Sequence, residues 1–222
     1  MSFQVKRMAR KPTLVNVSVK SENPMIYAEY IEHDRTLPIS IFEYIGRQEG
    51  WSGNGDVKLG NLGRAERIGP EPSVICLWRH AGMKRMDEWE ASFRTDEARR
   101  DPGFAATRLA IHFVRSGLYD EIIGGRALES GLHYVEFFAA DEEYENERIR
   151  AHFESRAANY PDGRLDFVLR RVGLLAPDPG CLAVWTFPGY AEVEPLARER
   201  HAGSPLRPTT AGLYYDFEDA II

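Results

Sequence analysis

Two glutamates in matching sequence surroundings are the residues best placed to do acid–base chemistry. Glu29 lies in the segment YAEYI at 27–31, and Glu136 lies in the segment YVEFF at 134–138. Because side chains alternate between the two faces of a strand, each glutamate shares a face with the tyrosine two residues before it. A carboxylate on a face that helices cover is costly unless it is paired. We therefore predict that the Tyr/Glu faces of both segments line one enclosed interior.

Enclosure of Glu29 and Glu136 in one space would change their acidity. Partial burial and mutual repulsion would raise the pKa of at least one carboxyl group toward the range of a general acid or base. Tyr27 and Tyr134 would flank the pair and orient substrate oxygens. The alternative interpretation is that each glutamate only pairs with an arginine across the barrel or lies at its solvated mouth.

Two histidines and one arginine are the candidate partners of these carboxylates. His80 follows Arg79 at the end of a predicted strand, and only one of these neighbours can face the interior. Histidine transfers protons near neutral pH, and arginine stabilises a phenolate or a developing oxyanion. His33 follows Glu29 by four residues and would share its face. Each histidine could equally be a surface or turn residue.

Aromatic side chains recur on the predicted strands, and most of them are expected to pack in the core. The candidates for ligand contact are Tyr27, Trp78, Tyr134, Phe138, Trp185 and Phe187. If several line one interior, the cavity suits a flat, hydrophobic aromatic molecule with a few polar groups. Arg and His follow Trp78, whereas Thr and Phe follow Trp185, which predicts one cationic, titratable pocket end and one apolar end.

The two segments belong to a tandem duplication. An offset of 107 residues carries 27–31 onto 134–138, and it also carries Trp78 onto Trp185. The last strand repeats with an offset of 95, because the second copy is 12 residues shorter after its tryptophan. Self-similarity of this kind indicates two copies of one structural unit.

Each copy has the pattern strand, helix, two strands, helix, strand. The predicted strands lie at 25–32, 57–68, 73–80 and around Tyr119 in copy one, and at 132–139, 165–175, 181–187 and around Tyr214 in copy two. The predicted helices lie after Thr36, at 86–99, after Asp141 and at 193–201. This βαββαβ order is the ferredoxin-like motif. Its helices cover one face of the sheet, so the other face needs a partner.

The predicted fold is therefore α+β, with two tandem ferredoxin-like repeats whose antiparallel sheets pack into a single-chain α+β barrel. The predicted domains are a basic N-terminal arm at 1–23, repeat 1 at 24–124 and repeat 2 at 131–222.

Over about residues 24–219 the chain resembles the dimeric α+β barrel superfamily in a tandem single-chain form. The strongest local similarity is to NIPSNAP-like and EthD-like members, in Ile26-Tyr27 and in Leu77-Trp78-Arg79 followed by a helix with Trp89. A cofactor-independent bacterial lyase that removes formaldehyde from lignin-derived diarylpropanes is similar in size and architecture. That similarity implies a base that deprotonates a primary hydroxyl, cleavage of a carbon–carbon bond, and acid-assisted loss of a benzylic hydroxyl.

Composition excludes several classes of partner. The chain has 222 residues and a net charge of -6, so it has no overall attraction to nucleic acid or anionic lipid. No apolar run reaches the about 20 residues that cross a membrane, and no secretory signal is present, which predicts a cytoplasmic protein. Two cysteines fit a reducing compartment.

No metal or cofactor motif stands out. The sequence has no HxH, HExxH or CxxC pattern, so we expect no metal site. Some barrels of this superfamily bind haem, but none of the six histidines is marked as an axial ligand. We expect the protein to work without a cofactor.

The first functional prediction is a cofactor-independent carbon–carbon lyase or isomerase of aromatic catabolism. Glu29 or Glu136 would be the base, and His80 or His33 the acid, while Arg79 would orient substrate oxygens. The alternatives are a non-catalytic small-molecule-binding protein, and a monooxygenase or haem enzyme of the same superfamily. A homodimer of the barrel is also expected.

Overall fold

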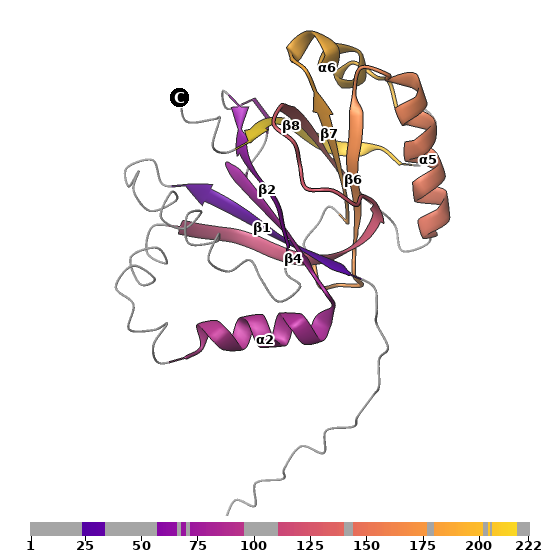
Figure 1. Cartoon of the computed structure of the whole chain (residues 1–222). Helices are drawn as coiled ribbons and strands as arrows, with labels where there is room; N and C mark the ends of the chain where they lie inside the picture. The colour runs from indigo at the N-terminus through magenta and orange to yellow at the C-terminus, as the bar shows by residue number, and fades with distance from the viewer. Residues whose placement is uncertain are drawn as a thin grey trace, which may run out of the picture.

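Eight strands form a sheet that closes on itself, so the molecule is an antiparallel barrel with helices packed outside it (Figure 1). The structure is a computed structural model that describes residues 24–33, 57–65, 68–69, 72–95, 111–139, 144–176, 180–201, 204 and 206–216. The predicted fold class, two ferredoxin-like α+β repeats in one barrel, is confirmed.

Each repeat supplies four strands. In repeat 1 these are β1 (Met25–His33), β2 (Val57–Arg64), β3 (Val74–His80) and β4 (Ile111–Ile123), with the helix α2 (Met83–Phe93). In repeat 2 they are β5 (Leu132–Phe138), β6 (Arg164–Arg171), β7 (Cys181–Phe187) and β8 (Pro208–Asp216), with the helices α5 (Asn146–Asn159) and α6 (Tyr190–Ala197). The predicted strands are confirmed to within a few residues, whereas the start of the helix after Thr36 lies outside the described residues. None of the described helices is long and apolar enough to span a membrane.

Helices α2 and α6 each begin three residues earlier than predicted, directly after a glycine. Gly82 adopts φ 129° and ψ 179°, a conformation that residues with a side chain rarely take, and this lets the chain turn from β3 straight into α2. Gly189 makes the corresponding turn into α6 with φ -173°, which is ordinary extended backbone. The apolar periodicity did not reveal these starts, because the first residues after the two turns, Met83 and Tyr190, are exposed.

The strand order places the two repeats on opposite sides of the barrel. Around the barrel it is β1-β3-β2-β8-β5-β7-β6-β4. The repeats join through the antiparallel pairs β2–β8 and β4–β6. Within each repeat the strands lie side by side in the order fourth, first, third, second, as in the ferredoxin-like motif. Strands β1 and β5 are therefore four strands apart in either direction around the barrel.

The pairing register matches the duplication. Tyr27 lies opposite Trp78 in β3, as Tyr134 lies opposite Trp185 in β7. On their other sides, the same tyrosines lie opposite Leu118 and Leu213, whose separation is the second offset of 95 residues. Equivalent positions of the two repeats can therefore be compared residue by residue.

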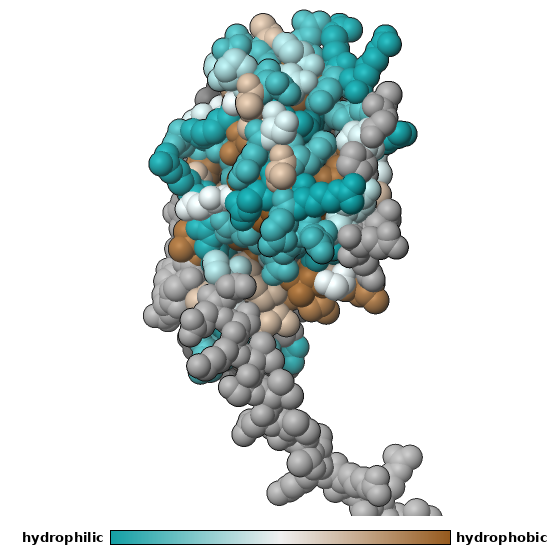
Figure 2. All heavy atoms as spheres, turned by 90° about the vertical axis from the view of Figure 1, so that its right-hand side faces the viewer, coloured by the Kyte–Doolittle hydropathy of each residue, from teal (hydrophilic) through white to brown (hydrophobic). Residues whose placement is uncertain are grey.

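The barrel interior is a packed apolar core. Its buried side chains come from both repeats and include Ile26, Ala28, Tyr30, Leu62, Leu77, Val135, Phe137, Leu169, Val184 and Tyr214. An eight-stranded barrel is just wide enough for side chains to fill it. A second core lies outside the barrel of repeat 2, where Ile149 and Phe153 of α5 pack on the sheet. Hydrophilic residues predominate on the outer surface of this side (Figure 2).

The prediction that the Tyr/Glu faces line the interior is wrong. On β1, it is Ile26, Ala28 and Tyr30 that point inward, so Glu29 points outward. On β5, Tyr134 belongs to the outer core with α5 and α6, so Glu136 also points outward. Since β1 and β5 lie on opposite sides of the barrel, the two glutamates do not share a space.

Candidate functional site

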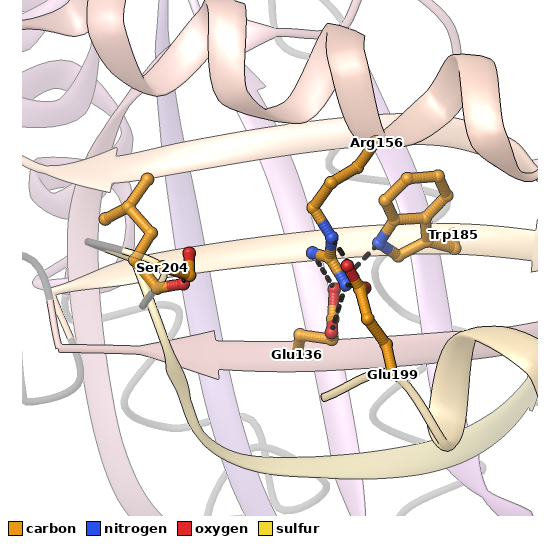
Figure 3. A network of polar contacts seen from close by, with 6 residues as sticks. Glu136, Arg156, Trp185, Glu199 and Ser204 are labelled. Carbon is orange, nitrogen blue, oxygen red and sulfur yellow. Dashed lines mark hydrogen bonds and ion pairs between the residues drawn. The ribbon is translucent and has the colours of Figure 1, made fainter. Parts of the chain in front are cut away.

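Glu136 is held in an ion pair beneath α5. Arg156 donates from Nη1 to Oε2 at 2.9 Å and from Nη2 to Oε1 at 3.0 Å, and the Trp185 indole donates to Oε2 at 3.0 Å (Figure 3). Glu136 is 0% exposed and Arg156 is 4% exposed. The arginine also donates to Glu199 from Nε at 3.0 Å and from Nη2 at 2.6 Å. This arrangement fits the structural interpretation of Glu136, with an arginine supplied by a helix instead of the far side of the barrel.

The aromatic candidates of repeat 2 surround this ion pair in a closed core. Tyr134, Phe138, Trp185 and Phe187 are all buried and pack in the cluster formed with α5 and α6. The Phe138 ring meets Phe153 edge to face at 5.2 Å, and the Arg156 guanidinium lies 5.5 Å from the centre of the Trp185 ring. Burial first, and then the charge of Glu136, raise the pKa of Tyr134, so its hydroxyl stays protonated.

On the outer face of repeat 1, four predicted residues lie together. Tyr27 and Trp78 are cross-strand neighbours, Glu29 lies two residues along β1, and the His80 ring lies 6.2 Å from the Tyr27 ring. Glu29 is 2% exposed and His80 is 0% exposed, whereas Tyr27 is only partly buried. Burial first, and then the charge of Glu29, raise the pKa of Tyr27, whose hydroxyl also interacts with Ser116. We call Tyr27, Glu29, His80 and their neighbours on this face the repeat 1 cluster.

Arg79 points away from this cluster, as strand alternation requires. Its guanidinium donates to Glu121 from Nε at 2.9 Å and from Nη2 at 2.8 Å. Both residues line a separate cleft of about 570 Å³, together with Asn146 and Arg150 at the start of α5. The side chain of His33, the other histidine candidate, lies outside the described side chains.

Sequence reasoning missed two members of the repeat 1 cluster, Asn61 and Ser116. The register aligns Ser116 of β4, Glu29 of β1, Cys76 of β3 and Asn61 of β2 in one row. Asn61 is 4% exposed, and within the described part of the chain its Oδ1 atom has no hydrogen-bond partner. Ser116 is exposed, so the row runs from solvent into the protein.

The duplication offset was the signal that could have found these residues. In repeat 2 the positions of Asn61, Cys76, His80 and Ser116 are taken by Val168, Ala183, Phe187 and Ala211. Apart from the glutamate that both repeats share, the row is thus polar in one repeat and apolar in the other. Glu29, His80 and Tyr27 can accept, hold or donate protons, and Asn61 offers a buried acceptor. Among the described residues, no three His, Cys, Asp or Glu side chains are grouped to hold a metal ion.

Comparison with solved structures agrees with the fold. A mutant chlorite dismutase from Candidatus Nitrospira defluvii superposes with a TM-score of 0.54 at 12% identity, covering 89% of this chain and 93% of that one. A haem-binding protein from Thermus thermophilus superposes with a TM-score of 0.56 at 13% identity, covering 90% and 93%. At such identities the likeness is one of fold, that of an α+β barrel.

Comparisons of sequence give no narrower assignment. No family model matches the chain, and no curated protein matches it. The similarity to NIPSNAP-like and EthD-like members is therefore not supported, and what is shown is the α+β barrel fold.

Proposed function

We propose that this protein binds a small organic molecule at the repeat 1 cluster, with Glu29, His80 and Asn61 as polar contacts and Tyr27 and Trp78 as aromatic ones. The observation that supports this is the difference between the repeats in the aligned row. A buried polar group costs free energy unless it is hydrogen-bonded, so a row with the same packing role in both repeats would not need the buried Asn61 in one of them only. A ligand that forms hydrogen bonds with this row would explain why the row is polar in repeat 1.

The chemistry of the cluster defines the class of ligand. The Asn61 Oδ1 atom calls for a hydroxyl or N–H donor, and the Tyr27 and Trp78 rings favour a flat apolar body. We therefore propose an aromatic molecule that carries a hydroxyl or amine group. Proton transfer between such a ligand and Glu29 or His80 would make the protein an enzyme. The neighbours of known structure lend support to small-molecule binding, and none to cofactor-independent carbon–carbon cleavage.

A transplant of repeat 2 residues into repeat 1 tests this proposal. The variant combines Asn61→Val, Cys76→Ala, His80→Phe and Ser116→Ala, and is compared with the exposed control Lys84→Gln. Aromatic alcohols and phenols are first screened against the unaltered protein by calorimetry. We expect the transplant to weaken binding of a hit by at least about tenfold and to leave the protein as stable or more stable. Full affinity in a folded transplant would refute the site.

A haem function is the second candidate, because the structural neighbours include a haem-binding protein and His152 has a nitrogen atom that could bind iron. His152 of α5 is partly buried, and within the described residues its Nε2 atom has no hydrogen-bond partner. Burial first, and then the charge of Arg156, lower the pKa of His152, which favours the neutral form that binds iron.

The space beside His152 does not fit a haem as it stands. Phe153 and Trp185 are fully buried there, and the ion pair of Glu136 and Arg156 occupies the layer between helix and sheet. When bound, haem would supply redox chemistry and ligand binding at iron. Titration with haem separates the two candidates. A stoichiometric Soret band that is lost in His152→Ala would establish haem binding. A titration without a Soret band would refute haem binding, and only the repeat 1 proposal would then stand of these two.

A further inference from the structure

The interior of the barrel ends in a polar cluster that the proposed function does not use. Tyr30, Tyr119 and Tyr214 belong to the buried interior core. Beyond them in the strands lie Arg115, opposite Tyr30, and Arg64, opposite Tyr214. Glu32 of β1 reaches the same region, since its charge and those of the two arginines all act on the Tyr214 hydroxyl. We call these six residues the interior polar end.

Three tyrosine hydroxyl groups lie in the interior polar end. The Tyr30 and Tyr119 hydroxyls are 2.8 Å apart, and the Arg115 guanidinium lies 5.5 Å from the centre of the Tyr30 ring. The Tyr214 hydroxyl donates to the Pro72 carbonyl at 3.3 Å. Burial is the first cause that raises the pKa of all three tyrosines, to about 12 for Tyr119. They are therefore neutral donors at physiological pH.

Glu32 and Arg64 each have a side-chain atom without a hydrogen-bond partner within the described part of the chain. Glu32 accepts a hydrogen bond from the Ser73 hydroxyl at Oε2, but within the described part of the chain its buried Oε1 atom has none, and neither has the buried Nε–H of Arg64. A buried charged group with an unused donor or acceptor costs free energy and indicates a missing partner. The missing partner must offer an acceptor to Arg64 and a donor to Glu32.

The duplication shows that the two repeats contribute different residues at several positions of this barrel end. Repeat 2 has the same residue types as Arg64 and Tyr119 at the equivalent positions, Arg171 and Tyr214. By contrast, the positions of Tyr30, Glu32, Ser73 and Arg115 are taken in repeat 2 by Phe137, Ala139, Gly180 and Thr210. At the positions that differ, repeat 1 is therefore charged or hydroxylated, and repeat 2 has apolar or small residues. Such a contrast suits a ligand with a polar group at one end and an apolar body.

We propose that the interior polar end binds a small aromatic carboxylate that also carries a hydroxyl or amine group. The carboxylate accepts from the Nε–H of Arg64, and the hydroxyl or amine donates to Oε1 of Glu32. Arg64, Glu32 and Arg115 are each only partly buried, so other parts of these three side chains reach the surface. The site lies at one end of the barrel, whereas the repeat 1 cluster lies on the outer face, so neither proposal depends on the other.

Calorimetric titration of the full chain with three probes tests this site. The probes are 4-hydroxybenzoate, benzoate and phenol, which carry both polar groups, only the carboxylate, and only the hydroxyl. We expect 4-hydroxybenzoate to bind at least about tenfold more tightly than either fragment, because loss of one charge-assisted hydrogen bond exceeds about 1.4 kcal/mol. A protein that binds none of the three, or binds all equally, would contradict the proposal.

Single variants then assign the contacts. Arg64→Gln should weaken 4-hydroxybenzoate and benzoate at least about tenfold and leave phenol unchanged, whereas Glu32→Gln should remove the preference for 4-hydroxybenzoate over benzoate. Arg170→Gln is the matched control, because Arg170 carries the same charge on β6 but bonds outward to Asn146. His80→Phe alters the repeat 1 cluster and so identifies any part of the binding of these probes that occurs there. If Arg64→Gln does not fold, Glu32→Gln decides the question, and an unchanged preference in that variant overturns the proposal.

Discussion

At the scale of single residues, the two duplicated glutamates show how a neighbour decides what a carboxylate does. Glu136 is enclosed by Arg156 and Trp185, which satisfy both of its oxygens. Glu29 occupies the equivalent position but lies in a row with Cys76, Asn61 and Ser116. A carboxylate with two arginine bonds is a structural element, whereas one in a row of side chains that reaches solvent suits binding and proton transfer.

The ion pair of Glu136 predicts a large loss of stability when it is broken. Arg156→Ala leaves a buried carboxylate without its counter-ion, so the free energy of unfolding should fall by about 3–5 kcal/mol. The double variant Arg156→Met with Glu136→Leu removes both charges and should recover most of that loss. Urea denaturation measures both effects. If Arg156→Ala costs less than about 1 kcal/mol, the pair does not have the role assigned to it here.

A buried histidine predicts how stability depends on pH. His133 of β5 is 0% exposed, and its Nδ1 atom lies 2.8 Å from the Thr186 hydroxyl. Burial lowers the pKa of His133, so the folded state keeps it neutral where the unfolded state, with a pKa of about 6.5, binds a proton. Its contribution to stability is therefore complete above that value and is lost as the pH falls below it.

The substitution His133→Ile copies Ile26, the equivalent residue of repeat 1, and isolates this contribution. Urea midpoints at about pH 7.5 and about pH 5.5, on either side of the ordinary histidine pKa, should differ less in the variant than in the unaltered protein. Because His152 also has a lowered pKa, some pH dependence should remain in the variant. An unchanged difference between the two midpoints would show that His133 is not responsible.

At the scale of elements, the two turns from strand to helix are equivalent in sequence but not in conformation. Gly82 has φ 129°, whereas Gly189 has φ -173°. Gly82→Ala should therefore cost about 1–3 kcal/mol, because that region of backbone conformation is open almost only to glycine. Gly189→Ala is the matched control and should be nearly neutral, since its new methyl group would meet only the flexible end of Glu192, at 3.3 Å. Thermal unfolding of the two variants checks the difference, and equal melting temperatures would contradict it.

At the scale of the whole molecule, the closed sheet explains why two repeats occur in one chain. Either repeat alone would expose two strand edges, those of β2 and β4 or those of β6 and β8, and one half of the interior core. The barrel is complete within one chain, so the predicted homodimer is not needed to close it and stays a prediction.

Cutting the chain in the exposed connection at Arg126 tests this account. Each half produced alone should aggregate or remain unfolded, because its unpaired edges and apolar face are uncovered. The two halves produced together should form a folded one-to-one complex. Light scattering after gel filtration measures the mass of each product. A half that is monomeric and cooperatively folded by itself would show that the barrel core is not shared as described.

Much of the architecture follows from the sequence alone. The offset of 107 residues between Tyr27 and Tyr134, and between Trp78 and Trp185, identified the duplication. Strand patterns placed six strands to within a few residues and located the other two around Tyr119 and Tyr214. Alternation along β3 correctly separated His80 from Arg79. These features depend on local periodicity, which a single chain displays directly.

The tertiary structure decided which face of each strand points into the barrel. Alternation sorts Glu29 and Glu136 onto the same kind of face, but it cannot say whether that face meets the other repeat or the helices. That choice depends on how the apolar residues of both sheets fill one closed interior and on Arg156, which reaches Glu136 from α5. Asn61 and Ser116 join the repeat 1 cluster through the pairing register of β2 and β4, and such long-range pairing is set only when the sheet assembles.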